Sequence, residues 1–195
     1  MDTTPRTRSI VDGTISSVAF AGGHRFAVGS WRSTPIGPFG DVMWAAPDDT
    51  RTLLAPNDEV ADYVTSIYEF DSVRTGPLRV ESDGRRTVVE GFGLSLDLLG
   101  GRLRPVPVPR PLWFTARVEG PIAKALMGVV TAGVSPTGVQ EWYQTRGWRW
   151  VVEGSGHLDG EELGAPVPIE RPLGVGFSEP PRRPSIVAVK VTIER

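Results

Sequence analysis

The sequence contains no cysteine and only two histidines, His24 and His157. Without cysteine there are no disulfide bonds, thiolate nucleophiles or cysteine-ligated metals. A histidine-rich metal site would need carboxylates at most of its positions, so we expect no metal. The dinucleotide, P-loop, GxSxG and HExxH motifs are also missing from the sequence, and we expect no cofactor.

The sequence also lacks long apolar runs and clustered charge of one sign. No run approaches the ~20 apolar residues of a membrane span, and the N-terminal MDTTPRTRS has no apolar core. We therefore expect a cytoplasmic protein without membrane contact. The net charge is −2 with both signs interspersed, which disfavours nucleic-acid binding. Nothing in the sequence decides for or against a homo-oligomer.

What the sequence does contain is typical of one β-rich domain. It has 195 residues, with 23 glycines and 18 prolines spread along the chain, which favours many turns. We expect a disordered tail over residues 1–9 and a single domain over 10–195. Alternating apolar residues predict strands, with hairpins at Gly22-Gly23, Asp83-Gly84 and Arg146-Gly147. The strand after Asp83-Gly84 is expected to continue through Leu98.

Two segments have helical spacing. Asn57 can cap a helix over 58–68, and Pro121 can open a second over 121–130. The expected total is nine to eleven strands and two short helices. We therefore predict an antiparallel, closed or nearly closed β-barrel, because closure removes exposed strand edges and leaves room inside for one small ligand.

Five segments together resemble the acetoacetate decarboxylase-like superfamily over roughly residues 14–195: WRSTPIGPFGDVMW, RPVPVPRPLW, EGPIAKALMGVVTAGVSPTGVQEWY, HLDGEELG and VGFSEPPRRPSIVAVKV. The resemblance implies a β-barrel-based cone with an internal cavity. It also implies chemistry on keto acids through a Schiff-base lysine beside a second lysine, with a Glu and an Arg in the cavity.

This chain departs from that pattern. In GPFGD, Asp41 stands where the family has its Glu, and either Arg25 or Arg32 would stand for the Arg. The adjacent lysine pair is missing, because the only lysines are Lys124 and Lys190. Arginine stays protonated and cannot form a Schiff base. Lys124 falls off the apolar stripe of its helix and Lys190 lies on the less apolar face of the last strand, so both are secondary candidates for a nucleophile.

The densest chemical cluster is Glu141-Trp142-Tyr143. On a strand, Glu141 and Tyr143 share a face and can form an acid/base pair at a cavity wall, with Trp142 on the other face. Trp148 and Trp150 share a face further along. Stacked tryptophans line ligand sites, although they more often form core. The candidate ligand-binding residues are Trp142, Trp148, Trp150, Phe92 and Arg25.

These residues support two hypotheses. The first is an enzyme acting on a small keto acid or a polyketide-like metabolite without a Schiff base, as a decarboxylase-like enzyme, dehydratase or cyclase. Its catalytic residues would be Asp41, Glu141, Tyr143 and Arg32, with the last acting as an arginine clamp. The alternative is a non-catalytic ligand-binding protein on the same fold. A cavity with several convergent polar groups would favour the enzyme. A third reading, an adaptor recruited through RPVPVPRP, requires that segment to be exposed.

Overall fold

The computed structural model describes residues 7–106, 111 and 130–195. It contains one sheet of fourteen strands with the central order β5-β4-β3-β2-β1-β14-β11-β8-β7-β6. The ten strands of this order are β1 (Arg8–Phe20), β2 (Arg25–Ser33), β3 (Phe39–Ala45), β4 (Arg51–Ala55), β5 (Ser72–Thr75), β6 (Leu78–Ser82), β7 (Arg86–Gly91), β8 (Leu94–Gly100), β11 (Gln140–Leu158) and β14 (Ser185–Glu194).

Four short strands pair beside this order. These are β9 (Arg104–Pro105), β10 (Ala132–Val134), β12 (Glu161–Glu162) and β13 (Pro166–Val167). The first three pair with β11 and the last with β1. Among the described strands every pair is antiparallel except β4 with β5, which is parallel, so the expected antiparallel sheet is in fact mixed.

One helix lies within the described residues, α1 (Asp58–Thr65), as predicted from the Asn57 cap. The Asn57 side chain accepts a hydrogen bond from the Val60 backbone N–H, at 2.9 Å. The helix ends three residues earlier than expected, and at eight residues it is far too short to cross a membrane. The expected second helix over 121–130 lies outside the described residues except for residue 130, and so do residues 107–110 of the proline-rich segment.

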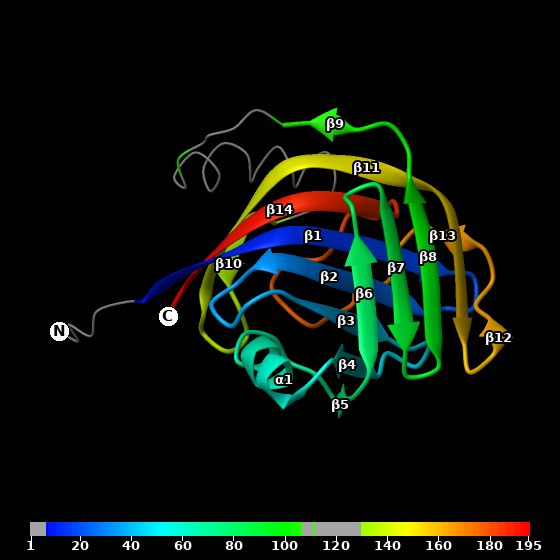
Figure 1. The fold of residues 1–195 in the computed structure, drawn as a ribbon, viewed down its shortest axis with the longest axis horizontal. Helices are drawn as coiled ribbons and strands as arrows, with labels where there is room; N and C mark the ends of the chain where they lie inside the picture. The colour runs from blue at the N-terminus through cyan, green and yellow to red at the C-terminus, as the bar shows by residue number, and fades with distance from the viewer. Residues whose placement is uncertain (1–6, 107–110, 112–129) are drawn as a thin grey trace.

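The sheet curls so that β6, β7 and β8 cross the face of β1, β2 and β3 (Figure 1). The interior between these layers is filled by apolar side chains, among them Val18, Phe26, Val42, Leu96 and Leu98. Although β6 packs against β3, the two are not joined by a ladder of hydrogen bonds. The expected closed or nearly closed barrel is therefore a curled sheet that hydrogen bonds do not close.

Two predicted strand patterns differ from the structure. The strand beginning at Arg86 does not continue through Leu98. Phe92 and Gly93 both have positive φ, 56° and 77°, and form a tight turn between β7 and β8. Conversely, Arg146-Gly147 is not a hairpin turn. β11 runs straight through it, with a bulge in its pairing to β14 between Thr145 and Gly147.

The two ends of the described chain lie side by side. Arg8 pairs with Glu194 in the ladder between β1 and β14, and their side chains form an ion pair at 2.9 Å. Residues 8 and 9, which were expected to belong to the tail, are part of β1. Residues 1–6 of the expected tail lie outside the described residues.

The close approach of β3 and β6 yields the first prediction. A Cβ built on Gly40 would overlap the side chain of Val80, so Gly40→Ala should force the two layers apart. We expect the free energy of unfolding to fall by about 1–3 kcal/mol in urea denaturation, which is typical of overpacking. Ser95→Ala, at an exposed position of β8, is the control and should change it by less than about 0.5 kcal/mol. If Gly40→Ala were as stable as the parent, β6 would not pack on β3 as described.

Candidate functional site

The main cavity lies on the outer face of the curled sheet and not inside it. Alternate residues of β1, β2 and β3 point to the filled interior, and the residues between them line a cavity of about 130 Å³. An apolar cavity of about 150 Å³ is known to accept benzene, so there is room for a small organic molecule. The sequence predicted room for a small ligand inside the barrel, but the interior is filled by apolar side chains and the cavity lies on the opposite face.

The cavity wall comes from five strands and three other segments. Its floor includes the small side chains of Ser17 and Ala27, which leave the space above them open. Tyr68, which follows α1, Thr131, which precedes β10, and several residues between 173 and 181 form the rest of the wall. The polar groups at the wall are Asp41, Tyr68, Tyr143, Trp31, Trp148, Glu179 and the hydroxyls of Ser17, Thr131, Thr145 and Ser178; the other lining residues are glycine or apolar.

Asp41 on β3 is the carboxylate that directly lines this cavity from the sheet. It is only 1% exposed, and Trp31 Nε1 donates to its Oδ1 at 2.8 Å. Gly29 leaves room for this bond, because a Cβ there would collide with both partners. Oδ2 has no hydrogen-bond partner among the described residues. Burial raises the pKa of Asp41 to about 6, and the Trp31 hydrogen bond opposes part of that rise.

Glu141 on β11 lies behind two tyrosines of the wall. Its side chain is fully buried, and its Oε2 accepts hydrogen bonds from Tyr68 at 2.7 Å and from Tyr143 at 3.0 Å. The two tyrosine hydroxyls are also in short contact with each other. Burial raises the pKa of Glu141 to about 7, against the two hydrogen bonds that favour the charged form.

The number of protons favours a neutral Glu141. The three oxygens make three mutual contacts, but an ionised Glu141 leaves only the two tyrosine protons to fill them. A proton on Oε2 of Glu141 supplies a third, and Oε2 then donates to one tyrosine and accepts from the other. The pKa values of both tyrosines are raised well above 10, first by burial, so neither hydroxyl ionises near neutral pH. The cluster is thus a set of hydrogen-bond donors next to a carboxyl that titrates near pH 7.

The described lining residues include no Lys or Arg. Arg32 has a side chain that is 72% exposed and forms an ion pair with Asp12 at 2.6 Å, so it does not clamp a ligand in this cavity. Arg25 is buried, but its guanidinium bonds to Asp49 and to the Ala46 carbonyl. Neither arginine lines the cavity.

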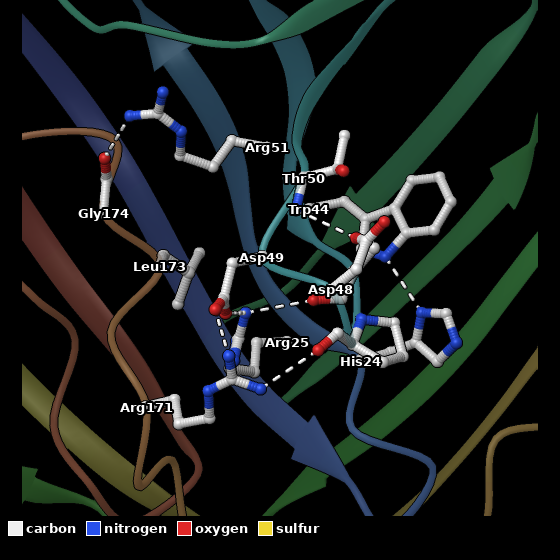
Figure 2. A network of polar contacts seen from close by, with 12 residues as sticks. His24, Arg25, Trp44, Asp48, Asp49, Thr50, Arg51, Arg171, Leu173 and Gly174 are labelled. Carbon is white, nitrogen blue, oxygen red and sulfur yellow. Dashed lines mark hydrogen bonds and ion pairs between the residues drawn. The ribbon is translucent and has the colours of Figure 1, made fainter.

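Arg25 belongs instead to an ion network that holds the segment after residue 171 against the turn between β3 and β4 (Figure 2). Asp49 binds both Arg25 and Arg171, and Arg51 donates to the Gly174 carbonyl at 2.8 Å. Glu179 accepts from the backbone N–H groups of residues 173 and 174. These contacts tie the cavity-lining stretch after residue 171 to the turn between β3 and β4.

The remaining candidates divide between the cavity and other places. Trp148 lines the cavity, whereas Trp142, Trp150 and Lys190 do not. Phe92 sits in the β7–β8 turn, where it packs against the interior cluster and under the guanidinium of Arg74. Lys124 lies outside the described residues.

Sequence reasoning missed Tyr68 and Trp31. Tyr68 was assigned to the end of a helix, but α1 ends at Thr65 and Ser66 caps it, so Tyr68 leaves the helix and reaches Glu141. Trp31 could have been found from strand parity, because it shares a face of β2 with Gly29, while Arg32 faces the other way.

Within residues 7–106, 111 and 130–195 there is no group of three His, Asp or Glu side chains arranged to hold a metal ion. Comparisons with protein-family models, curated proteins and solved structures find no match to this chain. The acetoacetate decarboxylase-like assignment therefore stays a prediction from the sequence.

The buried carboxyl of Glu141 predicts a pH-dependent stability. In the unfolded chain Glu141 ionises near its ordinary pKa of 4.5, but in the folded protein it keeps its proton up to about pH 7. The unfolded state then binds fewer protons, so stability present below pH 4.5 should fall by on the order of 3 kcal/mol as pH rises to 7. Asp41 acts in the same direction between 3.8 and about 6.

Urea denaturation across this pH range measures the effect, with Glu141→Gln as the test and Glu153→Gln, at an exposed position of the same strand, as the control. We expect the first variant to lose most of the fall above pH 6 and the second to keep it. An unchanged pH dependence in Glu141→Gln would contradict a raised pKa at this residue.

Proposed function

We propose that the protein is a cofactor-independent acid/base enzyme that removes a proton from the carbon next to a carbonyl group in a small, uncharged metabolite. The observation that carries this proposal is the convergence, in one mostly apolar cavity, of an unpartnered carboxylate oxygen on Asp41 with the hydroxyls of Tyr68 and Tyr143. A base and hydrogen-bond donors within a low-polarity site are what enolisation requires.

Asp41 is the base. Its Oδ2 has no partner among the described residues, while Trp31 holds the other oxygen and so orients the carboxylate. The raised pKa makes it a stronger base than an ordinary aspartate, yet it is still ionised at neutral pH.

One tyrosine hydroxyl stabilises the product of that proton transfer. With Glu141 protonated the cluster holds three protons, and one tyrosine O–H leaves its contact within the cluster to donate to the ligand oxygen. As the C–H electron pair moves into the carbonyl, negative charge develops on its oxygen, and an O–H donor offsets that charge. Glu141 does not line the cavity. Its role is to position the two hydroxyls and, when protonated, to complete their hydrogen bonds.

From the enolate, three outcomes balance without a cofactor. The proton can return to another carbon, a β-hydroxyl can leave as water after protonation, or the enolate carbon can attack a second carbonyl. These correspond to isomerase, dehydratase and cyclase reactions. Of the two substrate classes expected from the sequence, a polyketide-like metabolite fits better than a keto acid, because the described wall offers no cation for a carboxylate. Lys190, which does not line the cavity, supplies no Schiff base.

A non-catalytic binding protein is the second candidate. Apart from the polar groups named above, the lining residues are apolar or glycine. Such a cavity would hold an uncharged ligand without any reaction. The two functions differ in one measurable respect, which is whether the bound ligand exchanges its acidic protons faster than it does in buffer.

The proposed base predicts catalysed exchange of acidic C–H protons. Incubated in D₂O with uncharged ketones and β-diketones and followed by proton NMR, the protein should accelerate deuterium uptake next to the carbonyl. Asp41→Asn should lower the rate by about 100-fold or more, and Tyr143→Phe by about 10- to 100-fold. Trp142→Phe, off the cavity wall on the same strand as Tyr143, is the control and should keep the parent rate.

One result would go against the enzyme and another against Asp41 as its base. If a ketone binds, as judged by a raised melting temperature, but no exchange occurs, the protein is a binder. If Asp41→Asn exchanges as fast as the parent, another group is the base.

The two carboxyls also predict a bell-shaped dependence of the exchange rate on pH. The rate should rise through about pH 6 as Asp41 ionises and fall above about pH 7 as Glu141 loses the proton that completes the hydroxyl cluster. Glu141→Gln cannot lose that proton, so its profile should rise and then stay level. A fall at high pH that persists in this variant would assign the second ionisation to another group.

A further inference from the structure

The bulge in β11 is what brings Trp148 to the cavity. Tyr143 and Thr145 face the cavity from β11 opposite Val191 and Val189 of β14, and Trp148 lies opposite Val187 on the same face. In a regular strand, residue 147 would follow on this face and 148 would point away. Because Arg146 is inserted at the bulge, the tryptophan takes that position, and bulges of this kind often re-aim a side chain next to a functional site.

The ring of Trp148 packs against a second tryptophan. Trp150 packs edge-on against it, with ring centroids 6.3 Å apart and an angle of 69° between the planes. Trp150 is itself flanked by the guanidinium groups of Arg104 and Arg183, at 5.9 Å and 5.3 Å from its ring. This packing limits the freedom of the Trp148 side chain and so sets the direction of its indole N–H.

That N–H has no hydrogen-bond partner among the described residues, although it is buried. Two other tryptophans show the contrast: Trp31 donates to Asp41 at 2.8 Å and Trp44 donates to His24 at 3.0 Å. Leaving a buried donor unpaired is unfavourable, and a ligand oxygen at this position would pair it.

The same wall thus offers an unpaired donor on Trp148, an unpaired acceptor on Asp41 and the hydroxyls of Tyr68 and Tyr143. We propose that Trp148 is a specificity-determining residue that donates its indole N–H to a second carbonyl oxygen of the ligand, and that the substrate is therefore an uncharged β-dicarbonyl compound. This inference rests on the proposed function, in which the tyrosines bind the first carbonyl oxygen.

The chemistry of a β-dicarbonyl matches the three groups. Asp41 Oδ2 takes the proton from the carbon between the two carbonyls, and the C–H electron pair spreads over both oxygens. A tyrosine O–H and the indole N–H each face one of those oxygens, so both ends of the charge meet a donor. No oxidant, reductant or metal is needed for this step.

The test compares two ligands of similar size, acetylacetone and its monoketone counterpart methyl propyl ketone, in the parent, Trp148→Phe and Trp142→Phe. Trp148→Phe keeps an aromatic ring but removes the N–H. It should weaken acetylacetone binding about tenfold and leave methyl propyl ketone binding within about twofold, as expected for one lost hydrogen bond. Trp142→Phe, off the cavity wall, should change neither.

The indole N–H resonance reports a hydrogen bond to this group directly. In ¹⁵N-labelled protein, the signal missing from Trp148→Phe identifies Trp148, and in the parent it should shift downfield with acetylacetone but not with methyl propyl ketone. If Trp148→Phe weakened the binding of both ligands equally, or if the indole resonance did not move at saturating acetylacetone, the inference would be overturned. Trp148 would then be a packing residue.

Failure of the proposed function looks different from failure of this inference. If Trp148→Phe weakened only the binding of acetylacetone and the parent catalysed no deuterium exchange, the recognition of a β-dicarbonyl would be supported and catalysis overturned. Exchange that depends on Asp41 but is unaffected by Trp148→Phe for either ligand would support the enzyme and overturn the role of Trp148.

Discussion

Burial on both faces of β1, β2 and β3 is the constraint on which the site depends. One face packs against β6, β7 and β8 in the filled interior, and the other carries the cavity. Such strands cannot alternate apolar with polar residues in the usual way. Instead, large residues such as Phe26 and Val28 fill the interior, while on the other face Ala27 leaves space for the cavity and Gly29 leaves space for the Trp31–Asp41 hydrogen bond.

The same burial determines the electrostatics. Asp41 and Glu141 are removed from water, and no cation lines the cavity among the described residues, so both carboxyls titrate closer to neutral pH than they would in solution. Their partners are neutral donors, an indole and two phenols. A site of this kind suits proton transfer on an uncharged molecule, because it stabilises developing charge without binding a charged ground state tightly.

Local sequence patterns predicted those elements that depend on interactions between residues close together in the sequence. The Asn57 cap, the turn at Asp83-Gly84 and the alternation along β14 all have short-range causes, and each is present in the structure. The β7–β8 turn at Phe92-Gly93 was missed because a phenylalanine rarely adopts positive φ. The residues Arg146-Gly147 fit a turn as well as a bulge, because the two structures use similar residues. Only the pairing of β11 with β14 shows that they form a bulge.

For the site, the sequence by itself determined the absence of thiol chemistry and of the lysine pair, and strand parity placed Glu141 and Tyr143 on one face. Only the tertiary structure decided which face is open. It turned Arg32 to solvent, used Arg25 in a structural ion network and brought Tyr68 and Trp148 to the wall. The physical reason is that both faces of the central strands are apolar, so residue type alone cannot tell a packed face from one that leaves a cavity.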